Sequence, residues 1–141
     1  MIPRPTLTLL ALFAFLNVAL LVPTKGWAAG AALPAPAIVQ KTITAEVMTP
    51  DGAWVLTIDE IRQVERELWV FAEVKRPEGA IGALMQSAAS DQVSGRFPDL
   101  PVKIFVVGKN WSWANEEPVQ WLSSSNAAYE KRRQGRRLWR R

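Results

Sequence analysis

The chain has 141 residues, long enough for one domain, and its 49% apolar and 21% charged content is typical of a globular protein. It contains no cysteine and no histidine, which excludes disulfides, thiol nucleophiles, zinc held by Cys or His, and a Ser-His-Asp triad. We expect neither a cofactor nor a metal. The formal net charge of +4 comes from the end of the chain. Residues 130–141 hold 7 basic and 1 acidic side chains, whereas residues 30–129 hold 8 basic and 12 acidic ones.

The first 31 residues have the pattern of a secretory signal peptide. Arg4 precedes an apolar run over residues 7–22, and small residues follow it. Ala29 and Ala31 satisfy the A-x-A rule for cleavage after Ala31, and cleavage after Ala29 also fits. The apolar run is shorter than the roughly 20 residues that span a bilayer as a helix. We therefore expect a secreted or periplasmic protein, with an uncleaved N-terminal membrane anchor as the alternative.

The folded part of the chain is predicted to begin after a short linker. Residues 32–37 are rich in proline and alanine and predict an extended segment, so we expect a β-rich domain over residues 38–128. Residues 43–48 alternate between apolar and polar side chains, which is typical of a half-buried strand. A Pro-Asp-Gly turn follows at 50–52, and it predicts a hairpin with a second strand at 54–61.

The densest apolar stretch outside the N-terminus covers residues 52–77. It predicts the strand at 54–61 and another at 68–74, joined by a charged turn near Glu65 and Arg66. A helix is the alternative, because the apolar residues between 58 and 68 also match helical spacing. Both faces of the strand at 68–74 are apolar, which predicts a central strand with both faces covered. The Trp-rich segment after residue 108 is the expected cover for one face.

The remaining segments predict further strands and one helix. Residues 80–93 are small and weakly periodic, which fits either a strand or a loop, and two prolines predict a loop over 94–101. β-Branched residues predict a strand at 102–107. A serine or an asparagine at 125–126 is placed to cap a short helix through Tyr129. The sequence therefore predicts a mainly β fold, either a small antiparallel β-sandwich or an open barrel, with a short C-terminal helix.

Several features between residues 52 and 107 resemble a known group of exported domains. They are the Gly-x-Trp turn at 52–54, Leu68-Trp69-Val70, Lys75-Arg76-Pro77 and Pro101-Val102-Lys103-Ile104. This order is similar to small exported β-domains of the PrcB C-terminal (protease-complex-associated) type and, more distantly, to chagasin-like peptidase inhibitors. The resemblance implies a sandwich-like all-β fold and protein binding rather than catalysis. Glu78 follows Arg76-Pro77 where the chagasin-like pattern has Trp, and the Gly-rich middle loop of that pattern has no counterpart, so no inhibitory residues are carried over.

Tryptophans near the end of the domain are candidate binding residues. Trp111 and Trp113 point to one face of an extended chain, and Trp121 lies close by in sequence. Exposed, they form an apolar platform with polar indole edges, suited to stacking on sugars or to holding a partner's side chains. Buried, the same residues cover the sheet, which is the favoured interpretation because a core without disulfides needs large side chains.

The basic tail at 129–141 is a candidate for binding an anionic membrane surface or another polyanion. A disordered, solvated end is the alternative, and nucleic acid is the least expected partner if the protein is exported. The candidate residues are Lys131, Arg132, Arg133, Arg136, Arg137, Trp139, Arg140 and Arg141.

The sequence favours an exported, non-enzymatic β-domain that binds a protein or peptide partner. A cell-surface glycan-binding module that uses the tryptophans is one alternative. A small carboxylate-based enzyme is another, with Asp59-Glu60 and Glu116-Glu117 as the neighbouring acidic pairs. Glycosidase chemistry needs two carboxylates at a defined distance in space, which adjacency in sequence does not demonstrate.

Overall fold

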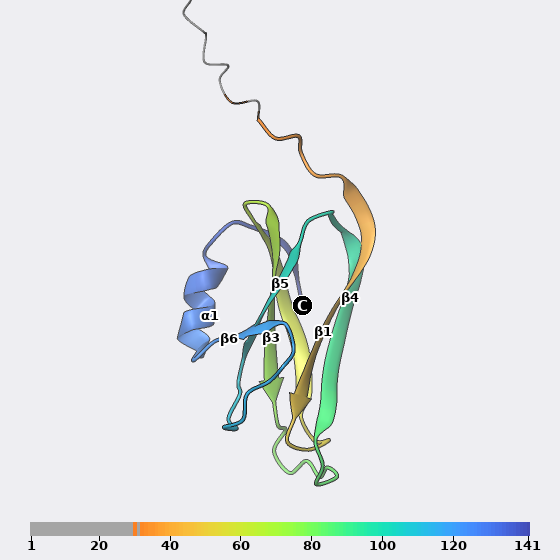
Figure 1. Cartoon of the computed structure of the whole chain (residues 1–141), viewed down its shortest axis with the longest axis vertical. Coiled ribbons are helices and arrows are strands. Elements are labelled where there is room, and N and C mark those ends of the chain that lie inside the picture. The colour runs from red at the N-terminus through yellow and green to blue at the C-terminus, as the bar shows by residue number, and fades with distance from the viewer. Residues whose placement is uncertain (1–29, 31) are drawn as a thin grey trace, which may run out of the picture. The chain divides into compact units, whose positions relative to one another are not determined.

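The computed structural model describes Gly30 and residues 32–141 (Figure 1). Apart from Gly30, the predicted signal peptide lies outside the described residues. Residues 32–37 have no regular secondary structure, and the first strand begins at Ile38. No helix in the described part of the chain is long and apolar enough to cross a membrane.

Two open sheets make up the fold, which confirms the predicted mainly β sandwich with a short C-terminal helix. The elements are β1 (Ile38–Thr49), β2 (Val55–Val64), β3 (Glu67–Lys75), β4 (Ser87–Pro98), β5 (Val102–Val107), β6 (Val119–Trp121), α1 (Ser125–Arg132) and β7 (Arg136–Arg140). One sheet pairs β1 with β4, and the other has the order β6-β5-β3-β2-β7. Pairing is antiparallel except between β3 and β5 and between β5 and β6, which are parallel.

β3 lies at the centre of the five-stranded sheet, as its sequence predicts. The charged turn at Glu65 and Arg66 joins it to β2, and Glu65 adopts a positive φ of 52° there. The inner face of β3 is buried, with Val70 at 0% exposure in the core between the sheets. Its outer face is covered at Phe71, which is 1% exposed and stacks on Phe105 of β5, while Trp69 is half-buried and Glu73 is exposed.

The predicted hairpin between β1 and β2 is wrong, because β1 pairs with β4 along its whole length. Ile43, Ala45 and Val47 of β1 are buried in the core. The connection after Thr49 carries the chain from one sheet to the other, so that the apolar faces of β1 and β2 contribute to the same core from opposite sides. Sheets packed face to face bury both apolar surfaces at once.

β4 corrects one prediction made from its composition and decides another that was left open. Residues 94–98 belong to this strand rather than to a loop. Pro98 is tolerated because it is the last residue of β4 and pairs with Ile38, the first residue of β1. The segment 80–93 is divided, since residues 80–86 form a loop and the strand starts at Ser87.

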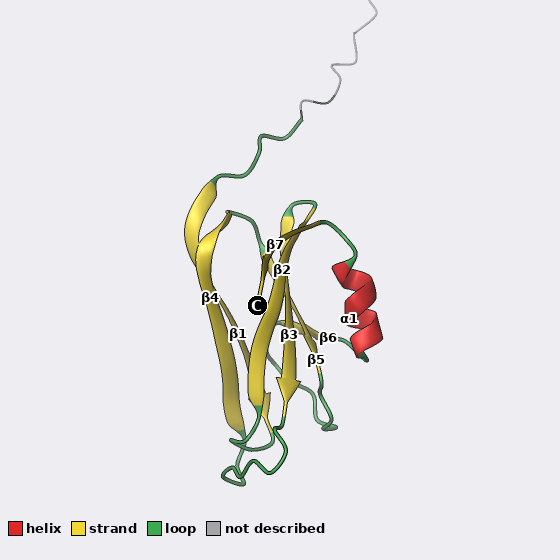
Figure 2. Ribbon diagram, turned by 180° about the vertical axis from the view of Figure 1, so that it is seen from behind, coloured by secondary structure: helices red, strands yellow, loops and turns green. Residues whose placement is uncertain are grey.

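The helix α1 covers the outer face of the five-stranded sheet, on the side away from β1 and β4 (Figure 2). Ala128 is its buried residue. The cap is Ser124, one residue earlier than predicted, and its hydroxyl accepts a hydrogen bond of 3.1 Å from the Ala127 amide. The Trp-rich segment does not cover this face. Trp111 and Trp121 pack instead against the core between the two sheets.

The predicted basic tail is part of the fold. β7 pairs with β2 on the side away from β3 and is the edge strand of the sheet, so the fold continues beyond residue 128. Leu138 and Trp139 pack against the core. Gly135, with a φ of +65°, lets the chain turn into β7 beside Gln63.

Candidate functional site

The loop between β3 and β4 holds three large apolar side chains in solvent. Ile81 and Leu84 are each 97% exposed, and Met85 is 66% exposed. Burying a large aliphatic side chain is worth ~1.5–3 kcal/mol, so this loop forgoes a substantial stabilisation. The sequence pattern did not identify it as a site, because Ile81 and Met85 also matched one face of a strand.

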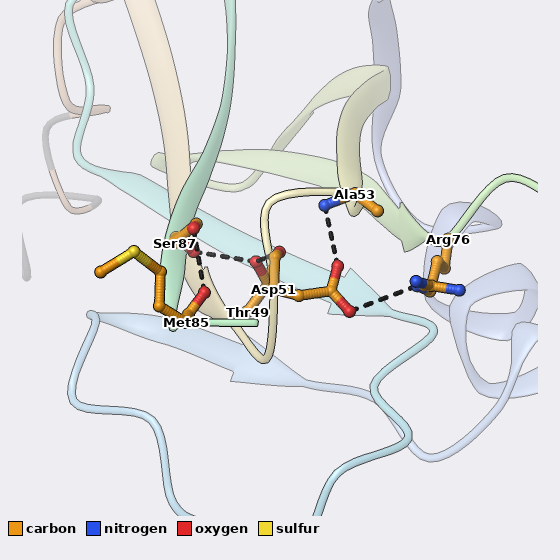
Figure 3. A network of polar contacts seen from close by, with 6 residues as sticks. All are labelled: Thr49, Asp51, Ala53, Arg76, Met85 and Ser87. Carbon is orange, nitrogen blue, oxygen red and sulfur yellow. Dashed lines mark hydrogen bonds and ion pairs between the residues drawn. The ribbon is translucent and has the colours of Figure 1, made fainter. Parts of the chain in front are cut away.

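Polar contacts fix both ends of this loop (Figure 3). Arg76 Nε lies 3.3 Å from Asp51 Oδ2, and the other oxygen of that carboxylate accepts a 2.8 Å hydrogen bond from the Ala53 amide. At the far end, the Thr49 hydroxyl donates to the Ser87 carbonyl at 2.8 Å. Both ends of the loop are thus bonded to residues at or beside the turn between β1 and β2, and the apolar side chains project from between them.

A cleft of about 390 Å³ adjoins the end of this loop. It is lined by Met48, Gln86, Trp113, Ala114, Glu116 and Glu117. The cleft and the loop residues Ile81, Leu84 and Met85 are called the loop–cleft surface below. The backbone of Met48 anchors the cleft, because its amide donates to Glu117 Oε1 and its carbonyl accepts a 2.9 Å hydrogen bond from Asn115.

Glu117 is ionised more readily than an ordinary glutamate. Burial by itself raises the pKa of Glu117, but hydrogen bonds from its own amide, the Met48 amide and the Asn115 side chain lower it, and so does the positive charge of Lys109. The net result is a pKa of Glu117 below its ordinary value. The cleft therefore holds a carboxylate that stays negative through the neutral and mildly acidic range.

The predicted tryptophan platform is a packed cluster centred on Trp111. The Trp111 ring lies 5.2–5.6 Å from the rings of Trp54, Trp113 and Trp121, and its indole N–H donates to Asn115 Oδ1 at 2.9 Å. Trp111 and Trp121 are half-buried and pack on the core. Trp113, also half-buried, lines the cleft.

Lys109 occupies the space that a cationic ligand of these tryptophans would need. Its Nζ lies 5.3–5.9 Å from the ring centres of Trp111, Trp113 and Trp121, and it donates a 2.6 Å hydrogen bond to the Trp113 carbonyl. The cluster thus makes its cation–π contacts within the chain.

A second surface lies where β2, β7 and α1 meet. A hollow of about 230 Å³ is lined by Glu60, Arg62, Tyr129, Arg132, Arg133, Arg137 and Arg140. It is called the arginine groove below. Four of the predicted tail residues line it. Arg62 and Tyr129 were missed by the sequence reasoning, because no local pattern brings residues 62 and 129 together.

The other predicted tail residues contribute to packing and to ion pairs elsewhere. Lys131 Nζ lies 4.8 Å from the ring centre of Phe105. Arg136 donates to the side chain of Gln63 at 3.2 Å, Arg141 pairs with Asp91, and Trp139 packs on the core. The structure therefore divides the predicted tail between the groove and the body of the fold.

The two acidic pairs considered for catalysis differ in their surroundings, since Asp59 and Glu60 bind different arginines and Glu116 and Glu117 share one cleft. Asp59 pairs with Arg132 at 3.2 Å, and Glu60 pairs with Arg62, while Glu116 and Glu117 line the cleft. Within residues 32–141, no group of three or more acidic side chains is arranged to hold a metal ion.

Comparisons with known proteins found no protein-family model that matches the chain, no curated protein that matches it and no solved structure that matches its fold. The resemblance to PrcB C-terminal and chagasin-like domains therefore remains a prediction.

Proposed function

We propose that this protein is an exported, non-enzymatic β-sandwich that binds a protein partner through the loop–cleft surface. The observation that carries the proposal is the 97% exposure of both Ile81 and Leu84 on a loop whose ends are fixed. A projecting apolar tip gains free energy when an apolar pocket receives it. Fixed ends reduce the entropy that is lost when the loop is ordered in a complex.

The charges around the loop favour a protein over an anionic membrane as the occupant. Residues 75–86 and the cleft lining carry three acidic side chains, Glu78, Glu116 and Glu117. They carry two basic side chains, of which Arg76 pairs with Asp51 and Lys75 has no ion pair among the described residues. Anionic headgroups attract basic surfaces and repel acidic ones. An apolar tip beside carboxylates instead fits a protein pocket that is apolar at its centre and basic at its rim.

The cleft supplies a second contact for the same partner. Trp113 lines it, and tryptophan is among the residues that contribute most to binding free energy in protein interfaces. Trp111 stacks on Trp113 and itself packs against the core. The tryptophans thus serve the same protein-binding surface, and no contact in the described residues favours the glycan-binding alternative.

Affinity capture from the exported fraction of the source organism tests the proposal. We expect the wild-type protein to capture a defined protein that the I81S/L84S variant fails to capture. The matched control is L33S, which removes an apolar side chain that is 69% exposed in the linker, and it should capture the partner like wild type. Melting temperatures of all three proteins verify that they fold. Equal capture by wild type and I81S/L84S would contradict the proposal, as would binding to phosphatidylcholine vesicles that depends on the loop.

A further inference from the structure

A β-bulge in β7 turns two arginines toward the same face. Arg62 pairs with Arg137, whereas the adjacent Ile61 pairs with Trp139, so that Leu138 is the extra residue of β7. In a regular strand, residues 137 and 140 would point to opposite faces. The bulge places Arg137 and Arg140 together on the outer face, where both line the arginine groove.

Three of the five guanidinium groups in the groove already have a carboxylate partner. The pairs are Arg62–Glu60, Arg132–Asp59 and Arg133–Glu130. Arg62 is held further by hydrogen bonds to the carbonyls of Gln134, at 2.7 Å, and Gly135, at 2.9 Å. These contacts orient one wall of the groove without any ligand.

Arg137 and Arg140 carry the charge that remains uncompensated. Neither forms an ion pair or a side-chain hydrogen bond with any described residue, and both are exposed. Arg137 also lies directly opposite Arg62 across the strand pair. Glu60 lies opposite Arg140, but its carboxylate pairs with Arg62, so the charge available to an anion in the groove is that of Arg137 and Arg140.

We propose that the arginine groove is a binding site for a doubly charged oxyanion of the phosphate-monoester type. Two uncompensated guanidinium groups match two negative charges, and their planar N–H groups suit bidentate contact with phosphate oxygens. Tyr129, which is 63% exposed, stands at the groove with a hydroxyl donor and an aromatic ring for the group that bears the phosphate. This site lies apart from the loop–cleft residues and goes beyond the proposed function.

The phosphate has two sources, a soluble molecule or a lipid headgroup, and two titrations of the full chain distinguish them. The first adds inorganic phosphate against chloride at matched ionic strength and follows the side-chain Nε–H signals of arginine by NMR. We expect saturable shifts at Arg137 and Arg140. The second adds phosphatidylcholine vesicles with and without phosphatidic acid, and binding only with phosphatidic acid identifies the lipid source. Phosphate binding without vesicle binding identifies a soluble ligand.

A charge-matched pair of variants separates a built site from general attraction. R137Q/R140Q should weaken phosphate binding by about tenfold or more, since charge-assisted contacts are lost. The control R66Q/R96Q removes the same charge from exposed arginines outside the groove and should change it by less than about twofold. Equal weakening in both variants, or wild-type NMR shifts no larger with phosphate than with chloride, would overturn the proposal. The wild-type shifts decide the matter even if a variant fails to fold.

Discussion

Arg141 Nη2 lies 2.6 Å from Asp91 Oδ2, so the last residue of the chain ties the five-stranded sheet to β4 of the other sheet. The same carboxylate oxygen accepts a 2.8 Å hydrogen bond from the Ile58 amide of β2. Arg141 adds hydrogen bonds from its Nε to the Ile58 carbonyl at 3.1 Å and from its amide to the Asp59 carbonyl at 2.9 Å. Asp91 and Arg141 thus join β2, β4 and the end of β7 at one point.

Replacing Arg141 should therefore lower stability even though its side chain is about half exposed. We expect R141A to lose about 1–2 kcal/mol of unfolding free energy, because an ion pair and a hydrogen bond disappear and Asp91 loses its counter-charge. Urea unfolding measures the change. R96A, on β4 without an ion-pair partner among the described residues, should stay within about 0.5 kcal/mol of wild type. Equal stability of R141A and R96A would show that the contact with Asp91 contributes nothing.

The turn into β7 should tolerate no side chain at Gly135. A Cβ there would lie 2.1 Å from the Gln63 carbonyl oxygen, and φ is +65°. Gly79 has a similar φ of +72° but open space around it, so G79A isolates the conformational cost of about 1 kcal/mol. G135A should cost at least about twice as much, because β7 must also shift away from β2. Thermal unfolding of both variants tests this, and equal melting temperatures would count against the close approach.

Trp111 and Trp113 should differ in what their replacement does. Trp111 packs on the core and contacts three other tryptophans, so W111A should destabilise the fold by about 3 kcal/mol. W113A should cost about 1 kcal/mol, since Trp113 lines the cleft instead of the core. Partner capture should nevertheless be lost in W113A. A stable W111A protein, with the melting temperature of wild type, would contradict the packed cluster.

Stability should fall in acid partly through Glu117. The folded-state pKa of this carboxyl lies below its ordinary value of 4.5, so its ionised form contributes stability above pH 4.5. That contribution is lost as the pH falls from 4.5 through the folded-state pKa. Urea unfolding at pH 7 and pH 3 should show a smaller acid-induced loss in E117Q than in wild type. An identical loss in both proteins would remove Glu117 from the account of acid unfolding.

Local pattern was sufficient to predict the centre of the sheet. The two apolar faces of 68–74 identified a central strand, and the charged residues around Glu65 identified the turn before it. A strand's alternation reports its own buried face but not its partner. The strand at 43–48 was therefore predicted correctly but assigned the wrong neighbour. Its actual neighbour, β4, was hard to predict as a strand because it is rich in small and polar residues.

The candidate site was harder to predict because its residues are gathered by tertiary structure. The arginine-rich end appeared as a charge run, and a charge run is usually a solvated face. Pairing with β2 makes it a strand, and the bulge at Leu138 turns Arg137 and Arg140 to one side. A bulge has no periodic pattern in the sequence from which it could be predicted. The loop at residues 80–86 was left open between a strand and a loop, so its apolar residues were not identified as an exposed candidate site.

Hydrogen exchange at the C-terminus tests the central claim most directly, namely that the basic end completes the sheet and thereby builds the arginine groove. The Arg141 amide donates to the Asp59 carbonyl, and β7 is paired with β2. We predict that exchange of the Arg141 amide and of the β7 amides bonded to β2 is slowed on the order of a hundredfold or more relative to an unstructured peptide. Exchange of residues 134–141 at the rate of an unstructured peptide would contradict the claim, because it would show that the end of the chain is a free tail.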